Sequence, residues 1–273
     1  MINVREAYSV KLFYMGRSPM GFLLYPVYAF LVGDTLIDTG TNRADHEFIS
    51  ALKGRAVARI INTHHHEDHI GNNAGVQAMF GIPIYAHALT LPYLDNPRLN
   101  KLRLYQRVVW DWPKPSKGTA IGSSLDAAAY HFEVIHSPGH TDDHICLYEP
   151  ERKWLFTGDL FCGTAFIYLR QDENYLQILD TLKKLAALDI NVVFCNLKGA
   201  VENGREALLK KIFRMEKLRD DVLKLRDQGL TASKIREKLL GKEDSWNLIT
   251  GGHYSKQNTV DSILFGKRPD EKQ

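Results

Sequence analysis

The chain has 273 residues, of which 44% are hydrophobic and 25% are charged. This composition supports one large folded core, alone or with an appendage, and argues against wholesale disorder. The 35 basic and 32 acidic side chains leave a net charge of +3, which is too small to indicate binding to nucleic acid or to an anionic membrane surface.

The cysteine content argues against a disulfide framework. Cys146, Cys162 and Cys195 are widely spaced and odd in number, which fits a reducing cytoplasm. The first residues lack the basic and apolar regions of a signal peptide. No apolar run is long enough to cross a bilayer. We therefore expect a cytoplasmic protein without a membrane partner.

The first third of the chain is typical of β-strands. Strands are expected over residues 8–13, 27–32 and 35–37. Gly33-Asp34 lies between the last two strands and suits a tight hairpin turn. A short apolar run, 57–61, ends just before a group of histidines. We interpret it as a buried strand that delivers a loop at its carboxyl end, where α/β folds bind ligands.

The next stretch is less regular. Residues 72–80 suggest a helix stopped by Gly81, and 84–86 suggest a brief strand. Residues 89–117 have no clear period and hold four prolines. Such a segment is typical either of a lid over a binding site or of an ordinary packed insertion.

The remaining chain predicts further strands and then helices. Strands are expected over 130–135, 145–148, 154–157 and 192–194, with a helix over 174–188 between the last two. Beyond Gly204, apolar residues recur every three or four positions as in an amphipathic helix, and a second helix follows Thr231. We therefore divide the chain into a main domain, 1–204, and a helical extension, 205–273.

The run from Thr63 to His69, which reads THHHEDH, predicts a metal site. It places four potential metal ligands within six positions: His64, His66, Asp68 and His69. Alternate residues of an extended loop point to the same side, so the first two histidines can bind one ion. Asp68 and His69 can then face a second ion or a water molecule. His65 and Glu67 are out of phase and are not expected to bind metal.

Two downstream turns offer further ligands. His140 lies in a turn after the strand ending at Ile135, and Asp159 follows the strand and glycine at 156–158. Either residue alone would usually be an ordinary turn residue. Together with the histidine run, each supports the interpretation of the other as a metal ligand. Imidazole nitrogen combined with carboxylate oxygen suits zinc, iron or manganese.

Together these motifs resemble the metallo-β-lactamase-fold hydrolases. The spacing from His64 to His69 is similar to the superfamily signature, and His140 and Asp159 are similar to its next two motifs. The resemblance covers about residues 20 to 200. It implies an α/β fold, an αββα sandwich of two mixed sheets with outer helices, here followed by a C-terminal helical segment. Residues 1–204 would then form the catalytic domain.

The resemblance also implies roles outside the ligand set. Asp38, in an Asp-Thr-Gly turn, would support the site without binding the metal. Residues 156–161 and 194–195 resemble the glyoxalase II branch, whose members hydrolyse thioesters.

One position departs from the superfamily pattern. A further histidine usually follows the late strand, but Leu197 or Lys198 stands there in this chain. The second ion would keep only Asp68, His69 and a shared Asp159. An inward-pointing Lys198 would oppose that ion further, whereas His253, after two glycines, could replace the missing ligand.

The ligand set predicts hydrolysis of a small molecule by a metal-activated water, with Asp68 orienting that water or accepting its proton. The cofactor would be Zn²⁺, as one or two ions, or alternatively iron or manganese. Thioesters, other esters, lactones and phosphodiesters are the candidate substrates.

Three other functions stay open. A mononuclear iron enzyme similar to the persulfide dioxygenases could use His64, His140 and Asp159. The basic residues of 205–242 could bind nucleic acid, although a solvated helix face is the simpler interpretation. A non-catalytic binding module could retain a structural metal, and the apolar stripe of 208–225 could form an oligomer contact.

Overall fold

Two mixed β-sheets form the centre of the computed structural model, which describes residues 1–165 and 167–266. The first sheet has its strands in chain order: β1 (Ile2–Ala7), β2 (Val10–Arg17), β3 (Leu24–Val32), β4 (Thr35–Ile37), β5 (Arg59–Ile61), β6 (Ile84–Ala86) and β7 (Thr119–Ala120). Strands β1 to β4 pair antiparallel, whereas β4 to β7 pair parallel. The second sheet has the order β14 (Gly199–Glu202), β13 (Val192–Cys195), β11 (Trp154–Phe156), β10 (Ile145–Glu149), β9 (Tyr130–His136) and β8 (Ser124–Ala127). Its strands pair antiparallel except for β11 with β13.

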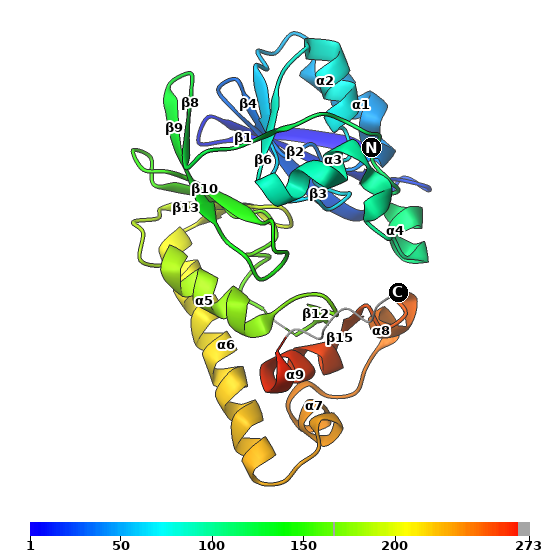
Figure 1. Cartoon of the computed structure of the whole chain (residues 1–273), viewed down its shortest axis with the longest axis vertical. Helices are drawn as coiled ribbons and strands as arrows, with labels where there is room; N and C mark the ends of the chain where they lie inside the picture. The colour runs from blue at the N-terminus through cyan, green and yellow to red at the C-terminus, as the bar shows by residue number, and fades with distance from the viewer. Residues whose placement is uncertain (166, 267–273) are drawn as a thin grey trace.

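Helices cover the outer faces of the sheets and the lower part of the molecule in Figure 1. They are α1 (Asp45–Leu52), α2 (Asn73–Phe80), α3 (Leu91–Asp95), α4 (Leu104–Val109), α5 (Tyr175–Leu185), α6 (Gly204–Asp227), α7 (Ala232–Leu240), α8 (Ser245–Ile249) and α9 (Lys256–Phe265). Short 3-10 turns are η1 (Asn42–Ala44), η2 (Ala88–Thr90) and η3 (Pro97–Leu99). A two-stranded ribbon joins β12 (Leu169–Arg170) to β15 (Tyr254–Ser255).

The hairpins follow from local turn chemistry. Gly33 has φ +58° and turns the chain between β3 and β4, as the sequence predicts. Tyr8 and Ser9 also have positive φ and form the turn that pairs Ala7 with Val10. The strand expected over 8–13 is therefore wrong in its first two residues, because they turn the chain instead of extending it.

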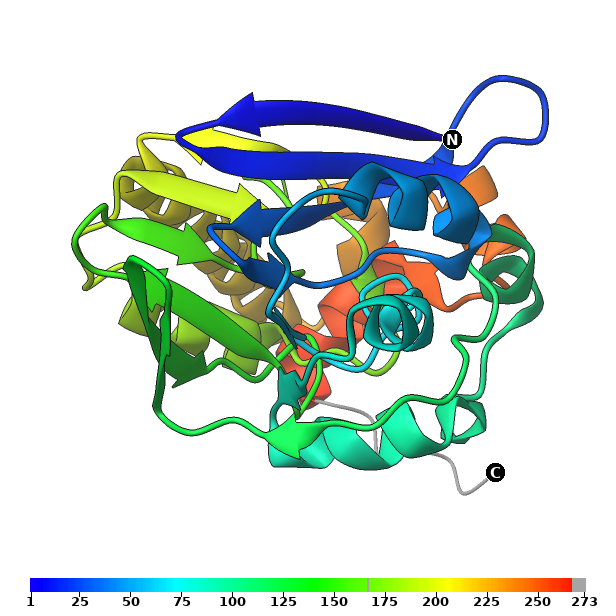
Figure 2. The ribbon, with the colours of Figure 1, turned by 90° about the horizontal axis from the view of Figure 1, so that it is seen from above.

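Three layers of hydrophobic contact hold the sandwich together. The inner faces of both sheets meet in one cluster, in which Phe156 and Phe194 stack at 4.6 Å and Phe30 contacts both rings. The outer face of the first sheet packs on α1 and α2 through Phe48 and Val76. The outer face of the second sheet packs on α5 and α6. This layering is the αββα sandwich that the sequence predicts (Figure 2).

The C-terminal helices share a core with the second sheet. Leu208 and Met215 of α6 are fully buried in the same cluster as Leu179 of α5 and Val193 of β13. The hydroxyl of Tyr175 donates to the carbonyl of Met215, which ties α5 to α6 at 2.8 Å. The division of the chain at residue 204 stays a prediction.

Residues 89–117 are more regular than their sequence indicates. Two short helices, α3 and α4, lie within a segment that was expected to be irregular. Both are only five or six residues long, too short for a hydrophobic period to be seen. Trp112 anchors the segment, since its indole N–H donates to the carbonyl of Asn100.

Among the residues that the structure describes, no helix combines the length and the apolar character that a membrane span needs.

The inner core makes the first testable prediction. Phe194→Ala should lower the free energy of unfolding by about 3–5 kcal/mol, because it leaves a cavity between the two sheets. Phe213→Ala is a matched control, since Phe213 lies on α6 with 66% of its surface exposed. The control should change stability by less than about 0.5 kcal/mol. Denaturant unfolding of both variants measures the difference, and equal effects would contradict this account of the core.

Candidate metal centre

The predicted ligands come from three places in the fold and lie close together. The loop after β5 carries the histidine run, and the turn between β9 and β10 carries His140. Asp159 follows β11, three residues beyond its buried end at Phe156. The proposed ligands thus follow strands of the two sheets, which gives these side chains rigid supports.

The first group of donors is His64, His66, His140 and Asp159, whose ligand atoms all lie within 4.8 Å of one another. Nδ1 of His66 lies 2.8 Å from Nε2 of His64 and 2.9 Å from Nε2 of His140. Oδ2 of Asp159 lies 3.6 Å from the same nitrogen of His140. Three imidazole nitrogens and one carboxylate oxygen form a donor set that fits zinc, iron or manganese.

Burial keeps these imidazoles suited to metal binding. Burial lowers the pKa of His64 and His66 well below the ordinary value, and neighbouring imidazoles and Arg170 lower it further. Neutral imidazoles retain the lone pair that a metal ion needs. Burial also lowers the pKa of His144 to about 3, and Nδ1 of that residue pairs with Oγ of Ser137 at 2.8 Å. His144 thus lies beside the first group but not in it.

The second group of donors is Asp68, His69 and Asp159. Nε2 of His69 lies 3.4 Å from Oδ1 of Asp159 and 4.0 Å from Oδ2 of Asp68. Asp159 therefore belongs to both groups. Burial raises the pKa of Asp68 to about 7, although the nearby His69 opposes that rise.

Asp38, directly after β4, contacts the loop that carries the histidine run. Its φ is +57°, in the left-handed region that few residues other than glycine adopt. Its carboxylate accepts from the backbone N–H and the hydroxyl of Thr63, both at 2.8 Å, and pairs with Nδ1 of His69 at 2.7 Å. Asp38 thus lies behind the proposed metal ligands, where it orients His69.

Glu173 is a residue of the centre that the sequence analysis missed. Its carboxylate lies 2.5 Å from Nδ1 of His140 and accepts from the backbone N–H of Arg170 at 2.7 Å. A carboxylate on the outer nitrogen of a histidine fixes which nitrogen faces the metal. The only sequence signal was an acidic pair, Asp172-Glu173, directly before the expected helix.

Arg170 was missed as well, and it lies against the first group. Its Nη1 is 3.2 Å from Nδ1 of His66, while Nε and Nη2 pair with the carboxylate of Asp172 at 3.0 and 2.8 Å. The side chain is buried. A buried cation beside a proposed metal site is unfavourable by itself, so its position calls for a functional explanation.

Lys198 and His253, the two further residues considered from the sequence, lie outside the donor groups found among the described residues. Nδ1 of His253 pairs with the hydroxyl of Tyr105 at 2.7 Å, and its Nε2 lies 3.6 Å from Asp172. Lys198 is exposed, and its side chain runs near Gly163.

The out-of-phase residues of the histidine run turn away from the donor groups. His65 pairs with Asp143 at 2.9 Å and stacks on Tyr93 at 4.0 Å. Glu67 accepts from the side-chain amide of Gln106 in α4 at 2.9 Å. These contacts tie the metal loop to residues 89–117.

A pocket of about 350 Å³ opens beside His140. Its lining combines the metal loop with the segment 89–117: His65, Leu89, Tyr93, Leu99, Asn100, His140, Thr141, Asp142, Asp143 and Asp172. Tyr93 therefore lines this pocket, whereas Trp110 and Trp112 donate hydrogen bonds that anchor their segment.

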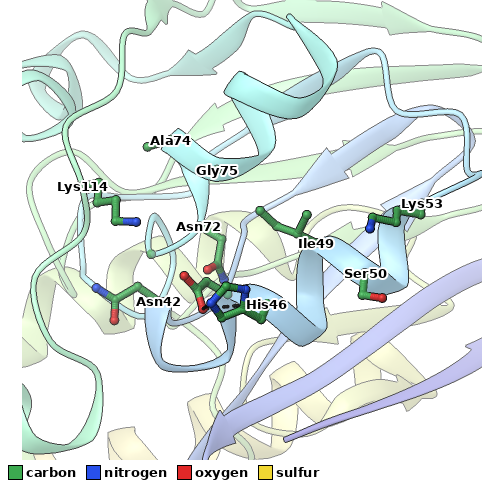
Figure 3. A pocket seen from close by; sticks show the side chains of 11 residues that line it. Asn42, His46, Ile49, Ser50, Lys53, Asn72, Ala74, Gly75 and Lys114 are labelled. Carbon is green, nitrogen blue, oxygen red and sulfur yellow. Dashed lines mark hydrogen bonds and ion pairs between the residues drawn. The ribbon is translucent and has the colours of Figure 1, made fainter.

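A second pocket, of about 230 Å³, lies between α1 and α2 (Figure 3). Asn42, His46, Asn72 and Lys114 are among its lining residues. None of the proposed metal ligands lines it. Of these two pockets, the one beside His140 is the one that touches a proposed metal ligand.

Comparison with known proteins gives a consistent assignment. A sequence model of the metallo-beta-lactamase superfamily matches residues 24–195. Hydroxyacylglutathione hydrolase from Pseudomonas aeruginosa is 28% identical over 74% of this chain and 68% of its own length. The enzyme of that name from Bdellovibrio bacteriovorus is 32% identical, but the match spans 55% of this chain and about half, 53%, of the relative. A beta-lactamase domain protein from Burkholderia ambifaria has a similar fold, with a TM-score of 0.68, 16% identity and coverage of 96% and 88% of the two chains.

Glu173 provides a test of how the centre is supported. Glu173→Ala removes the carboxylate from the outer nitrogen of His140 and should weaken metal affinity by about 10–100-fold. Competition with a chromophoric chelator measures this affinity. Glu151→Ala is the control, because Glu151 is 77% exposed and should leave the affinity unchanged. Unchanged affinity in a folded Glu173→Ala protein would show that Glu173 does not support the centre.

Proposed function

Because the chain belongs to the metallo-beta-lactamase superfamily and is a hydrolase of that fold, we propose that it cleaves a thioester with a metal-activated water. The observation that supports this proposal most is the convergence of three imidazole nitrogens and a carboxylate oxygen in the first group. The relatives named hydroxyacylglutathione hydrolase favour a thioester over the other candidate substrates. Zinc is the proposed metal, and iron or manganese would suit the same donors.

The proposed reaction assigns the metal and the chain separate tasks. A divalent ion held by His64, His66, His140 and Asp159 would make water nucleophilic at neutral pH and polarise the acyl oxygen. Asp68 is the proposed proton acceptor, because its carboxylate faces the donor groups and is not needed by the first of them. The water oxygen attacks the acyl carbon and the carbon–sulfur bond breaks. The departing thiolate then takes up the proton from Asp68.

Arg170 is proposed to contact the substrate. Its Nε and Nη2 are occupied by Asp172, so Nη1 is the donor that faces the first group. Nη1 lies 3.2 Å from Nδ1 of His66, but that nitrogen could not accept a hydrogen bond while it bound a metal. Nη1 then requires another acceptor, and the acyl oxygen of the substrate would supply one. A fixed donor at this point stabilises negative charge as it develops on that oxygen.

The activity itself gives the next prediction. The zinc-loaded protein should release free thiol from a hydroxyacyl glutathione thioester, and a chelator should abolish this release. His140→Ala should lower the rate by about a thousandfold or more, since it removes a proposed ligand. His131→Ala on β9 is the control, because His131 is half-exposed and distant from both donor groups. A thiol-reactive dye measures the rate of thiol release by the wild type and by both variants.

Failure of this prediction would have a defined meaning. If the protein with zinc, iron or manganese bound released no thiol from any acyl thioester, the proposed hydrolysis would be wrong, and a metal-retaining binding module would explain the centre better. If the iron-loaded protein instead consumed oxygen with a persulfide, the reaction would be oxidative.

Arg170 makes a separate prediction about the rate. Arg170→Met should lower kcat/KM by about 10²–10³-fold, with metal content unchanged, because one donor to the reacting oxygen is lost. Arg103→Met is the matched control: Arg103 bonds to Gln171, the neighbour of Arg170, and to the carbonyl of Gly251, without contacting the imidazoles. Equal losses in both variants would indicate that Arg170 only holds its segment in place.

A further inference from the structure

The side chain that follows β13 bears on how many ions the centre holds. Asn196 is 1% exposed, and its Nδ2 lies 2.6 Å from Nε2 of His69. The same side chain also hydrogen-bonds to Asp159. His69 and Asp159 are two of the three donors in the second group. Asn196 therefore faces the place where a second ion would lie.

The backbone of the neighbouring sheet fixes the orientation of this amide. The N–H of Tyr28 on β3 donates to Oδ1 of Asn196 at 3.0 Å and to its carbonyl oxygen at 2.8 Å. Because a backbone N–H can only donate, the amide oxygen must lie toward Tyr28 and the NH₂ group toward the second group of ligands. The NH₂ group has hydrogens and no free lone pair for a cation.

Strand alternation explains why Asn196 takes this place. Phe194 lies in the core between the sheets, and Cys195 lies in the core under α5 and α6. The next residue, Asn196, lies just beyond β13 and is buried on the side of His69. Leu197 is 47% exposed and Lys198 is exposed, so neither occupies the position facing the donors.

Accepting the proposed metal centre, we infer that it holds one tightly bound ion, in the first group, and that Asn196 blocks the second position. The second group has only three donors, and Asp159 is shared with the first. Nε2 of His69, its one nitrogen donor, lies 2.6 Å from the side-chain amide nitrogen of Asn196, where a metal ion would otherwise lie. A second ion would have to break this hydrogen bond and lie against the partially positive amide hydrogens. The chain therefore places hydrogen-bond donors where a two-ion centre would have its second cation.

The test is a metal titration that requires no turnover. Equilibrium dialysis against zinc, followed by elemental analysis, should give one tight ion per wild-type chain. Asn196→His should bind a second ion at least about tenfold more tightly than the wild type does, because an imidazole lone pair replaces the amide hydrogens. Leu197→His is the matched control, since it adds an imidazole one residue away on the exposed side and should leave the count at one.

Three results would overturn the inference. The first is a wild-type chain that binds two ions with affinities within tenfold of each other, which decides the matter even if Asn196→His does not fold. The second is a folded Asn196→His protein that gains no second ion, and the third is a gain in Leu197→His. These results are independent of the proposed reaction, whose own failure would appear as an ion bound without thioester turnover.

Discussion

The candidate centre depends on three imidazole nitrogens that are held within hydrogen-bonding distance of one another in a buried interior. Nε2 of His64 and Nε2 of His140 lie 2.8 and 2.9 Å from Nδ1 of His66, and all three residues are buried. Burying polar groups in this way costs free energy unless a partner is supplied. The sandwich tolerates the cost because its hydrophobic layers lie immediately behind the loops that carry these residues. A metal ion would satisfy all three nitrogens at once.

Three carboxylates near the donor groups hold neighbouring side chains in place. Asp38, Glu173 and Asp172 are each engaged by donors from other elements, and none of the three belongs to a donor group. Each one orients a different side chain: Asp38 holds His69, Glu173 holds His140, and Asp172 holds Arg170. Negative charge is thus placed on the outer side of the ligands, where it fixes their geometry and raises their basicity without competing for the metal.

The sequence predicted the parts of the centre that are close together in the chain. The αββα sandwich, which the resemblance carried by these motifs implies, is confirmed, and most strands and the helices α5 and α6 show in local patterns of apolar residues. The histidine run is local too, so its residues could be identified before the structure was known. The assignment of individual metal ligands stays a prediction, although the structure brings all of the proposed ones together.

The residues that escaped prediction are those whose role depends on contacts across the fold. Glu173 meets His140 across 33 positions, and Arg170 meets His66 across 104. No spacing rule connects such pairs, because their proximity is created by the way β12 and the start of α5 fold back over the metal loop. The short helices α3 and α4 escaped for another reason: a helix of five or six residues is too short to show a period.

Asn196 illustrates how a fold can change its chemistry at one position. Sequence comparison left the missing histidine opposite Leu197 or Lys198, because an alignment does not record which side of a strand a residue faces. Once β13 is paired with β11, the alternation of Phe194 and Cys195 between the two cores leaves only Asn196 directed at the donors. The hydrogen bond from Tyr28 then decides which end of the amide points inward. Strand register and one backbone N–H on the opposite sheet therefore set the electrostatic character of the second position.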